Sequence, residues 1–212
     1  VSRTDILCGF HSVSEAILAN RRQIHNVMIP KDKSGKRFEQ IMQQAQDAGI
    51  PVQEASMVQM DGLSKGVKHQ GVVAKTGPYP LQPVASKLHA LENTIDPCFI
   101  LILENMEDPH NMGALIRTAV CAGVDAVFIP KDRTTMPTPS VSRSSAGAME
   151  HAHIFMMTNT ASTIKQLKAC NVWVAGLDAH GDTPLFQADM TGRFALVVGS
   201  EHKGVRPLVQ KQ

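Results

Sequence analysis

The stretch Phe99-Ile-Leu-Ile-Leu103, with Asn111-Met-Gly-Ala-Leu-Ile-Arg117-Thr-Ala119 after it, decides the fold of this chain. The first part is an apolar run of strand length, and the second has the apolar spacing of a helix that stops at Gly123. A second apolar run, Ala195-Leu-Val-Val198, leads into Gly199-Ser-Glu-His-Lys-Gly204. Continuous apolar runs are typical of parallel strands that are covered on both faces. We therefore expect each run to deliver polar residues and glycines to the carboxyl edge of the sheet, where open α/β sheets bind ligands.

Strands and helices alternate over the rest of this half of the chain. The pattern predicts further strands at 125–129, 154–157 and 172–177, and helices at 140–148 and 161–169. This alternation indicates an α/β domain built on a parallel sheet.

The first part of the chain has the pattern of a smaller α/β unit. Its spacing predicts helices at 12–19 and 38–48 and strands at 24–29, at 71–74 and from position 51. Residues 77–83 then contain three prolines, a density that disfavours both helices and central strands. We therefore predict a first domain at 1–77, a linker at 78–97 and a second domain at 98–212.

Composition excludes several classes of protein. The net charge of +2 is too small for a polycation, so any nucleic acid must be bound by a local basic patch. The four cysteines form no C-x-x-C pair, and no apolar run reaches the length of a membrane span or a signal peptide. We therefore predict a reduced, cytoplasmic protein.

Two further groups of residues are not expected to form sites. Arg21 and Arg22 are expected to be solvated. No metal is predicted, because His151 and His153 lack a third ligand.

Three residues of the two motifs are candidates for chemistry. Asn111 stands where its helix is predicted to begin, a position at which asparagine is also a common N-cap. Arg117 is suited either to gripping a phosphate or to taking a proton, and we favour the grip because a guanidinium is almost never deprotonated. Glu201 is placed to hold a ligand hydroxyl or to orient Arg117. The alternatives are an ordinary helix cap for Asn111, a solvated surface arginine for Arg117 and an ordinary turn for Glu201. Neither a G-x-G-x-x-G nor a P-loop motif is present, so ordinary nucleotide sites are not supported.

The basic segment Lys65-Gly-Val-Lys68-His69-Gln-Gly71 is a candidate for binding RNA. Lys65, Lys68 and His69 are of the types that contact phosphates, which position RNA without specifying its sequence. The alternative is a solvated turn.

These segments together resemble the SpoU-type (SPOUT superfamily) RNA ribose 2′-O-methyltransferases. Asp108–Gly113, Ile129–Arg133, Met190–Arg193 and the Glu201 loop occur in the order of that family. The segment Gly9-Phe-His-Ser-Val13, with the His-Gln-Gly segment, is similar to its amino-terminal RNA-binding module, most of all in the large-subunit rRNA guanosine enzymes.

The resemblance implies an S-adenosylmethionine-dependent enzyme that methylates a ribose 2′-hydroxyl, with guanosine in large-subunit rRNA as the expected substrate. It implies a trefoil knot and a homodimer that pairs through the catalytic domain. It also implies catalytic roles for Asn111, Arg117 and Glu201, and methyl-donor contacts from the residues Thr158, Leu177, Gly199 and Gly204. A tRNA ribose methyltransferase and a noncatalytic ribosome-assembly factor of the same fold remain alternatives.

The chain departs from the family pattern at two places. His202 stands where family members usually have glycine. The family also has a third motif after the glutamate loop, an isoleucine-proline strand end and a serine-leucine-asparagine helix start, which completes the donor pocket and the knot. The sequence ends at Gln212 before such a motif. We therefore expect this polypeptide to bind the methyl donor weakly or not at all.

Overall fold

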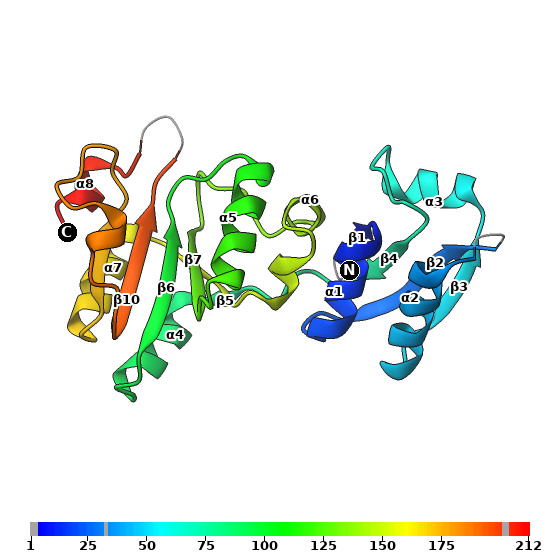
Figure 1. The fold of residues 1–212 in the computed structure, drawn as a ribbon, viewed down its shortest axis with the longest axis horizontal. Helices are drawn as coiled ribbons and strands as arrows, with labels where there is room; N and C mark the ends of the chain where they lie inside the picture. The colour runs from blue at the N-terminus through cyan, green and yellow to red at the C-terminus, as the bar shows by residue number, and fades with distance from the viewer. Residues whose placement is uncertain (1–3, 32–33, 201–203) are drawn as a thin grey trace. The chain divides into compact units, whose positions relative to one another are not determined.

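The computed structural model describes residues 4–31, 34–200 and 204–212 of the chain (Figure 1). It forms two compact units. The first contains the residues through Pro80 together with Gly113–Arg117 and Met136–His151, and the second contains Leu81–Met112, Thr118–Thr135 and Ala152–Gln212.

The first unit contains a four-stranded sheet in the order β1-β4-β2-β3. Strand β4 is antiparallel to β1 and β2, whereas β2 and β3 are parallel. The elements of this region are β1 (Asp5–Cys8), α1 (Phe10–Ala19), β2 (Ile24–Pro30), α2 (Lys36–Asp47), β3 (Val52–Ala55), α3 (Met57–Ser64) and β4 (Val73–Thr76). Helices α1 and α2 bury Val13, Ile17 and Ile41 in one apolar cluster with the sheet. The sequence patterns had indicated five of these elements and had missed β1 and α3.

A buried ion pair lies in the first unit, beside α6 (Pro139–Ser144) and the 3₁₀ helix Ala148–His151. Arg22 Nε lies 2.9 Å from a carboxylate oxygen of Glu150, and both side chains are almost fully buried. Burial raises the pKa of the Glu150 carboxyl above its ordinary value, and the charge of Arg22 opposes that rise. The prediction that Arg22 is solvated was therefore wrong: its guanidinium neutralises a buried acid, as burial of a charge requires.

The second unit is built on a six-stranded parallel sheet in the order β5-β8-β7-β6-β10-β9. Its elements are β5 (Gln82–Pro83), α4 (Val84–Glu92), β6 (Cys98–Leu103), α5 (Pro109–Cys121), β7 (Ala126–Pro130), β8 (Ile154–Met157), α7 (Thr160–Ala169), β9 (Trp173–Gly176), the 3₁₀ helix Leu185–Gln187, β10 (Arg193–Val198) and α8 (Pro207–Gln210). Helix α5 contributes Gly113–Arg117 to the first unit. The α/β fold class with a parallel sheet is confirmed.

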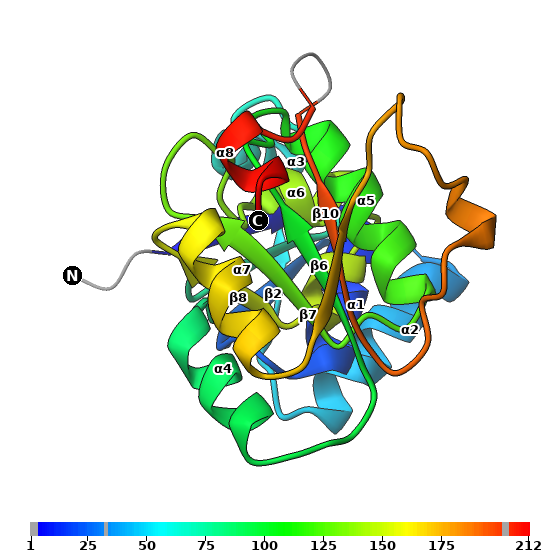
Figure 2. The same cartoon turned by 90° about the vertical axis from the view of Figure 1, so that its left-hand side faces the viewer.

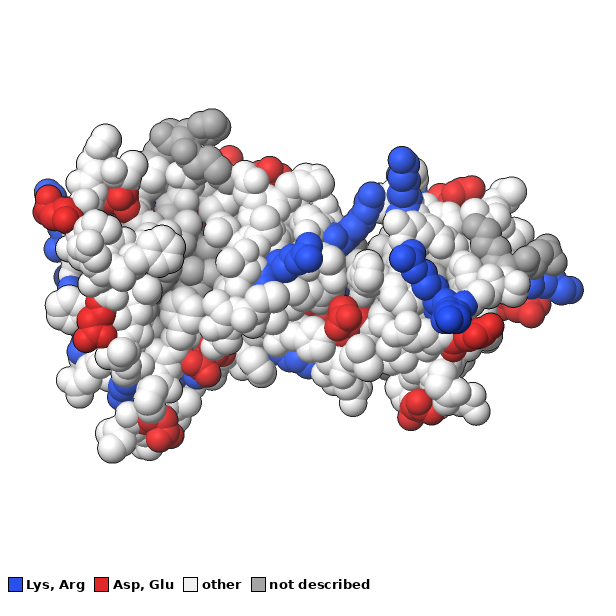
Figure 3. Space-filling view, viewed as in Figure 1, with Lys and Arg blue, Asp and Glu red and all other residues white. Residues whose placement is uncertain are grey.

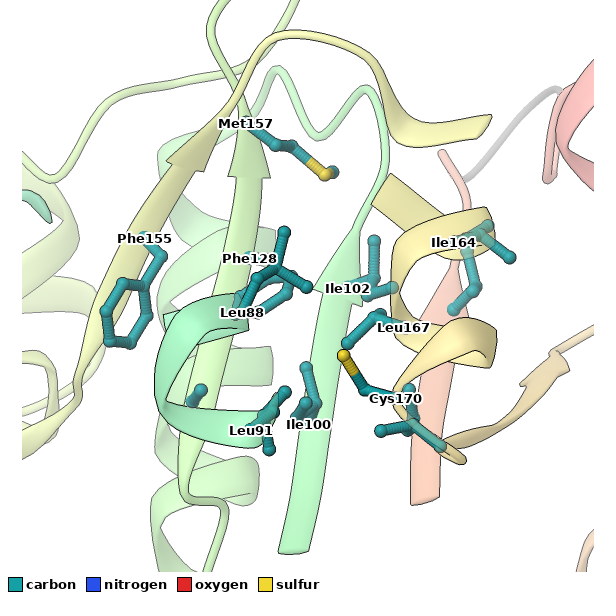
Figure 4. Close-up of a cluster of buried hydrophobic side chains, with 14 of the residues drawn as sticks. Leu88, Leu91, Ile100, Ile102, Phe128, Phe155, Met157, Ile164, Leu167 and Cys170 are labelled. Carbon is teal, nitrogen blue, oxygen red and sulfur yellow. The ribbon is translucent and has the colours of Figure 1, made fainter. Parts of the chain in front are cut away.

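Helices cover both faces of this sheet, with α4 and α7 on one side and α5 on the other (Figure 2). On the first face, Leu88 of α4 and Leu167 of α7 pack with Ile100 and Ile102 of β6 in one buried cluster (Figure 4). Leu101 and Leu103 are equally buried although they alternate with that pair. Burial on both faces explains why β6 is apolar at every position.

The segment 78–97, predicted to be a linker, contains ordered structure. Strand β5 pairs with β8 at the sheet edge, and α4 buries Leu88 and Leu91 in the core. The prolines that suggested a linker fit this role, because Pro83 ends an edge strand and caps α4. No helix in the described part of the chain is long and apolar enough to cross a membrane.

Candidate active site at the carboxyl edge of the parallel sheet

The carboxyl ends of β6 and β10 lie side by side. The two strands are parallel, and Leu103 pairs with Val198 in the last register position. On its other side β6 pairs with β7, the strand that follows it in the sequence, whereas β10 comes near the end of the chain. The strand order therefore reverses between β6 and β10, the point at which open α/β sheets bind their ligands.

A buried carboxylate joins the two strand ends. Glu104 directly follows β6 and is fully buried, and its N–H donates to the carbonyl of Val198. Its Oε1 accepts from Nε (2.8 Å) and Nη2 (2.6 Å) of Arg206, and its Oε2 accepts from the Arg206 backbone N–H (3.2 Å). Glu104 thus fixes the end of the loop that follows β10. Sequence reasoning missed Glu104, although a charged residue directly after an apolar strand is a usable signal.

Two predicted donor-binding glycines contact each other. A Cβ atom on Gly199 would lie 2.0 Å from the carbonyl carbon of Gly204, so no side chain fits there. Gly204 has a φ of +59°, and its N–H donates to the carbonyl of Ser200 at 2.9 Å. The backbones of Gly199 and Gly204 therefore lie in direct contact. Glu201, the acid predicted within the loop between them, lies outside the described residues.

Helix α5 carries the other motif, and it begins earlier than predicted. Asp108 is the N-cap, and its side chain accepts from the N–H of His110 at 2.9 Å. The alternative interpretation of Asn111 as the helix cap is therefore excluded, because an aspartate followed by a proline at the first helical position begins the helix earlier. Asn111 is exposed in the first turn, and Arg117 is exposed further along the helix.

Gly113 allows another part of the chain to approach the backbone of α5 closely. A Cβ atom at Gly113 would lie 2.0 Å from Ser144 Oγ and 2.8 Å from the backbone nitrogen of Ser145. The glycine therefore brings the end of α6 against the motif helix within the first unit.

Two cavities lie where β9 and β10 end, with volumes of about 190 and 450 Å³, and both are lined by Gly176, Leu177 and Asp178. Val197 and Val205 add apolar walls to the smaller one. Apolar walls suit an adenine ring, and the Asp178 carboxylate suits ribose hydroxyls. The residues present therefore fit an adenosine-containing methyl donor.

Thr158, the fourth predicted donor-binding residue, lines a different cavity. It follows β8, and the sheet order puts four strand spacings between β8 and β9. That separation is roughly 19 Å at the usual distance between strands. The structure therefore does not bring Thr158 together with Leu177, because neighbours in sequence order are not neighbours in the sheet.

The three residues of the predicted RNA-binding loop differ in burial. Lys65 and Lys68 are exposed, and basic side chains project from the surface around the loop that follows α3 (Figure 3). His69 is only 4% exposed: its Nδ1 accepts from the N–H of Gly71, and its Nε2 lies 3.0 Å from Asp61 Oδ1. An accepting Nδ1 leaves the proton on Nε2, which donates to Asp61. His69 is therefore placed to order the loop and not to contact a phosphate.

The two amino-terminal motifs meet in the first unit. A cavity of about 170 Å³ is lined by His11 from the first motif, by Lys68 and Gln70 from the second, and by Arg143. Three basic side chains thus line one cavity.

Within the described residues, no group of three or more His, Cys, Asp or Glu side chains is arranged to hold a metal ion.

Comparison with known proteins matches both regions of the chain. Residues 98–212 match the SpoU rRNA Methylase family, and residues 6–82 match the family described as RNA 2′-O ribose methyltransferase substrate binding. The 23S rRNA (guanosine-2′-O-)-methyltransferase RlmB of Escherichia coli is 34% identical over 208 residues, which cover 98% of this chain and 85% of that protein. RlmB of Neisseria meningitidis is 35% identical, covering 96% and 80%.

Solved structures share the fold. The SpoU methyltransferase AviRb from Streptomyces viridochromogenes in complex with AdoMet has a TM-score of 0.78 at 15% identity, covering 97% of this chain and 77% of that one. An AdoMet-bound rRNA methyltransferase from Sinorhizobium meliloti has a TM-score of 0.72 at 21% identity, covering 99% and 76%. With family matches to both regions and relatives above 30% identity along almost its whole length, the chain belongs to the SpoU rRNA methylase family.

Proposed function

We propose that the protein transfers a methyl group from S-adenosylmethionine to the ribose 2′-hydroxyl of a guanosine in 23S rRNA. The observation that carries this proposal is the junction of β6 and β10, where the two motifs of a methyltransferase family leave adjacent strand ends. The substrate comes from the RlmB relatives, whose name specifies that reaction.

The proposed mechanism divides the roles among the residues of the site. The bound donor supplies an electrophilic methyl group. Arg117, which stays charged, grips a phosphate beside the target ribose, while Asn111 and Glu201 hold the ribose hydroxyl and orient Arg117. Leu177, with Gly199 and Gly204 as parts of the loop after β10, contacts the donor. Alignment of the 2′-oxygen with the methyl group then provides most of the rate. The products would be the methylated ribose and S-adenosylhomocysteine, with the hydroxyl proton passing to water.

RNA binding in this proposal begins with the amino-terminal module. Lys65 and Lys68 contact phosphates, and His69 supports them by ordering their loop.

Three finer features complete the proposal: a trefoil knot, a cytoplasmic location and a homodimer that pairs through the catalytic domain. The exposed residues Ala114 and Thr118 on α5 support the dimer, because small side chains let a second helix approach closely. Sedimentation velocity at several concentrations tests the dimer, and a monomer throughout would exclude it.

Transfer of a radiolabelled methyl group to 23S rRNA, followed by digestion to nucleosides, tests the activity. The wild type is expected to yield 2′-O-methylguanosine. Arg117→Ala is expected to abolish transfer while donor binding, measured by calorimetry, stays at the level of the wild type. Arg117→Lys should not restore it, because an ammonium lacks the planar fork of a guanidinium.

The exposed Arg37 of α2 provides the matched control, and Arg37→Ala should retain transfer. Near-normal turnover by Arg117→Lys would remove the phosphate grip from the mechanism. RNA binding without any donor binding or transfer would instead identify a noncatalytic assembly factor.

A further inference from the structure

The basic cavity of the first unit, of about 170 Å³, brings together three segments of the chain. Its basic wall residues are His11 in α1, Lys68 in the loop after α3, and Arg143 in α6. His11 and Lys68 lie in the region that matches the substrate-binding family, whereas Arg143 lies in the region that matches the methylase family. Of these three residues, only Lys68 has a role in the proposed function.

The positive charge of this cavity is not compensated. Among the described residues, its wall contains no acid. None of the three basic side chains pairs with an acid in the described part of the chain, whereas three other histidines and two other arginines do. The whole chain has a net charge of only +2, so this gathering of cations is local. A concave site lined by charges of one sign raises the local concentration of ligands of the opposite sign.

Hydrogen bonds fix the loop of Lys68 beside the start of α1. The neighbouring residue His69 is buried, and its carbonyl accepts from the N–H of Val72 at 2.9 Å. The carbonyl of Val72 accepts in turn from the N–H of Gly9, the residue before α1, also at 2.9 Å. Lys68 and His11 are therefore carried by segments that are tied together.

Close packing fixes the segment of Arg143 against the same helix. Gly147 follows α6, and a Cβ atom there would lie 2.6 Å from Glu15 Cγ and 2.7 Å from the carbonyl oxygen of His11. Four residues further on, Nε2 of His151 lies 2.8 Å from Oε2 of Glu15. The segment that carries Arg143 is thus fastened to α1 at two points, one of them at His11 itself.

The charge of Arg143 acts on the wall of the cavity. Cys8 lines the cavity, and burial raises the pKa of its thiol. The positive charge of Arg143 opposes that rise, which places the guanidinium close to the wall.

The backbone around the cavity is strained. Gln70 and Ala146, from two different segments of the wall, have φ values of +53° and +52°. Residues with side chains rarely adopt this conformation. Such strain persists where the surrounding structure imposes it, and it gathers at functional sites.

The donors in the wall define the ligand. A guanidinium forms two parallel hydrogen bonds with a phosphate, and an ammonium adds a point charge. The imidazole of His11 and the amide of Gln70 add further N–H donors. Because no acid balances these groups, the cavity suits a phosphate of a polyanion, whose neighbouring phosphates strengthen the attraction.

We propose that this cavity binds one backbone phosphate of the RNA substrate, shared by Arg143, Lys68 and His11. RNA as the ligand rests on the proposed function. The site adds Arg143 and His11 to the residues that hold the substrate, and it joins the two family regions of the chain on a single phosphate.

Binding of a short synthetic RNA hairpin, measured without a methyl donor over a range of salt concentrations, tests this site. Lys68→Gln and Arg143→Gln are each expected to lower the slope of log Kd against log salt by about one phosphate contact. Because both residues hold the same phosphate, the double variant should also lower the slope by about one contact and not by two. His11→Ala is expected to weaken binding about ten-fold, the value of one hydrogen bond to a charged group.

A control and a stability measurement separate binding from folding. Lys36 is exposed at the start of α2 and is absent from the cavity wall, so Lys36→Gln should leave the RNA affinity and the salt slope unchanged. Arg143→Gln relieves repulsion among the basic side chains and should leave the urea midpoint unchanged or raised. A lowered urea midpoint with unchanged RNA affinity would overturn the proposal in favour of a structural role for Arg143.

Inorganic phosphate is titrated against the same variants, because a free anion has the same chemistry as a backbone phosphate. Phosphate binding that Arg143→Gln abolishes, with unchanged RNA affinity, would overturn the proposal in favour of a site for a free anion. A slope lowered by two contacts in the double variant would overturn the sharing of one phosphate. A wild type that binds no RNA would overturn the proposed function, whereas RNA binding that every cavity variant retains in full would overturn only this site.

Discussion

Arg206→Ala should destabilise the protein more than Glu104→Gln, although the two residues share the same interaction. Arg206→Ala leaves the Glu104 carboxylate fully buried without the two guanidinium donors, and only the backbone N–H of residue 206 still donates to it. Breaking a buried pair in this way costs about 3–5 kcal/mol. The Arg206 side chain is 43% exposed, so water already screens part of its attraction to Glu104. We therefore expect Arg206→Ala to lower the free energy of unfolding by about 3 kcal/mol, the low end of that range.

Glu104→Gln removes the charge from the buried side of the pair. The half-exposed guanidinium of Arg206 then turns to water, and the amide oxygen of glutamine still accepts one bond. The expected cost is about 1–2 kcal/mol, close to that of a hydrogen bond to a charged group. In the double variant neither charge is left without a partner, so its cost should be lower than the sum of the single costs by about 1–2 kcal/mol.

Urea unfolding of the wild type, both single variants and the double variant provides the four free energies of this cycle. Glu92→Gln is the control, because Glu92 forms an exposed pair with His89 and should contribute no measurable stability. Equal costs for the two single variants, or strict additivity in the double variant, would refute the argument that burial of Glu104 governs this interaction.

Three further predictions follow from the packing and charges. A glycine-to-alanine change normally stabilises a helix, but Gly113→Ala should lower the free energy of unfolding by about 1–3 kcal/mol, because the new Cβ meets Ser144 and backbone atoms. Urea unfolding measures this change, and a stabilised variant would contradict the contact. Because burial raises the pKa of Glu150 above its ordinary 4.5, its protonation favours the folded state. The wild type should therefore lose stability relative to Glu150→Gln as the pH rises from 4.5 through the higher folded pKa, and a constant difference would exclude the shift. Replacing Lys65 and Lys68 together with alanine should lower the salt slope of RNA binding by about two phosphate contacts, and an unchanged slope would place the RNA surface elsewhere.

Much of the fold was readable because local signals agreed with the tertiary structure. The apolar run of β6 and the helix stop after α5 each predicted an element near its observed position. Helix α3 was missed although Ser56 and Gln59 form a capping box, a pattern visible in the sequence. Helix α4 was missed because two leucines in a polar, proline-flanked segment do not reveal that a sheet lies beneath them.

The sequence by itself determined the alternation of strands and helices, the family of the chain, and the motifs that end β6 and begin the loop after β10. Only the tertiary structure decided which strand ends are neighbours, since the order of strands in a sheet depends on crossover connections and not on distance along the chain. That order separates Thr158 from Leu177, and it joins Glu104 to Arg206 across 102 positions. Burial likewise gave His69 a role that its residue type alone does not specify, because its hydrogen-bond partners become available only when the loop closes over them.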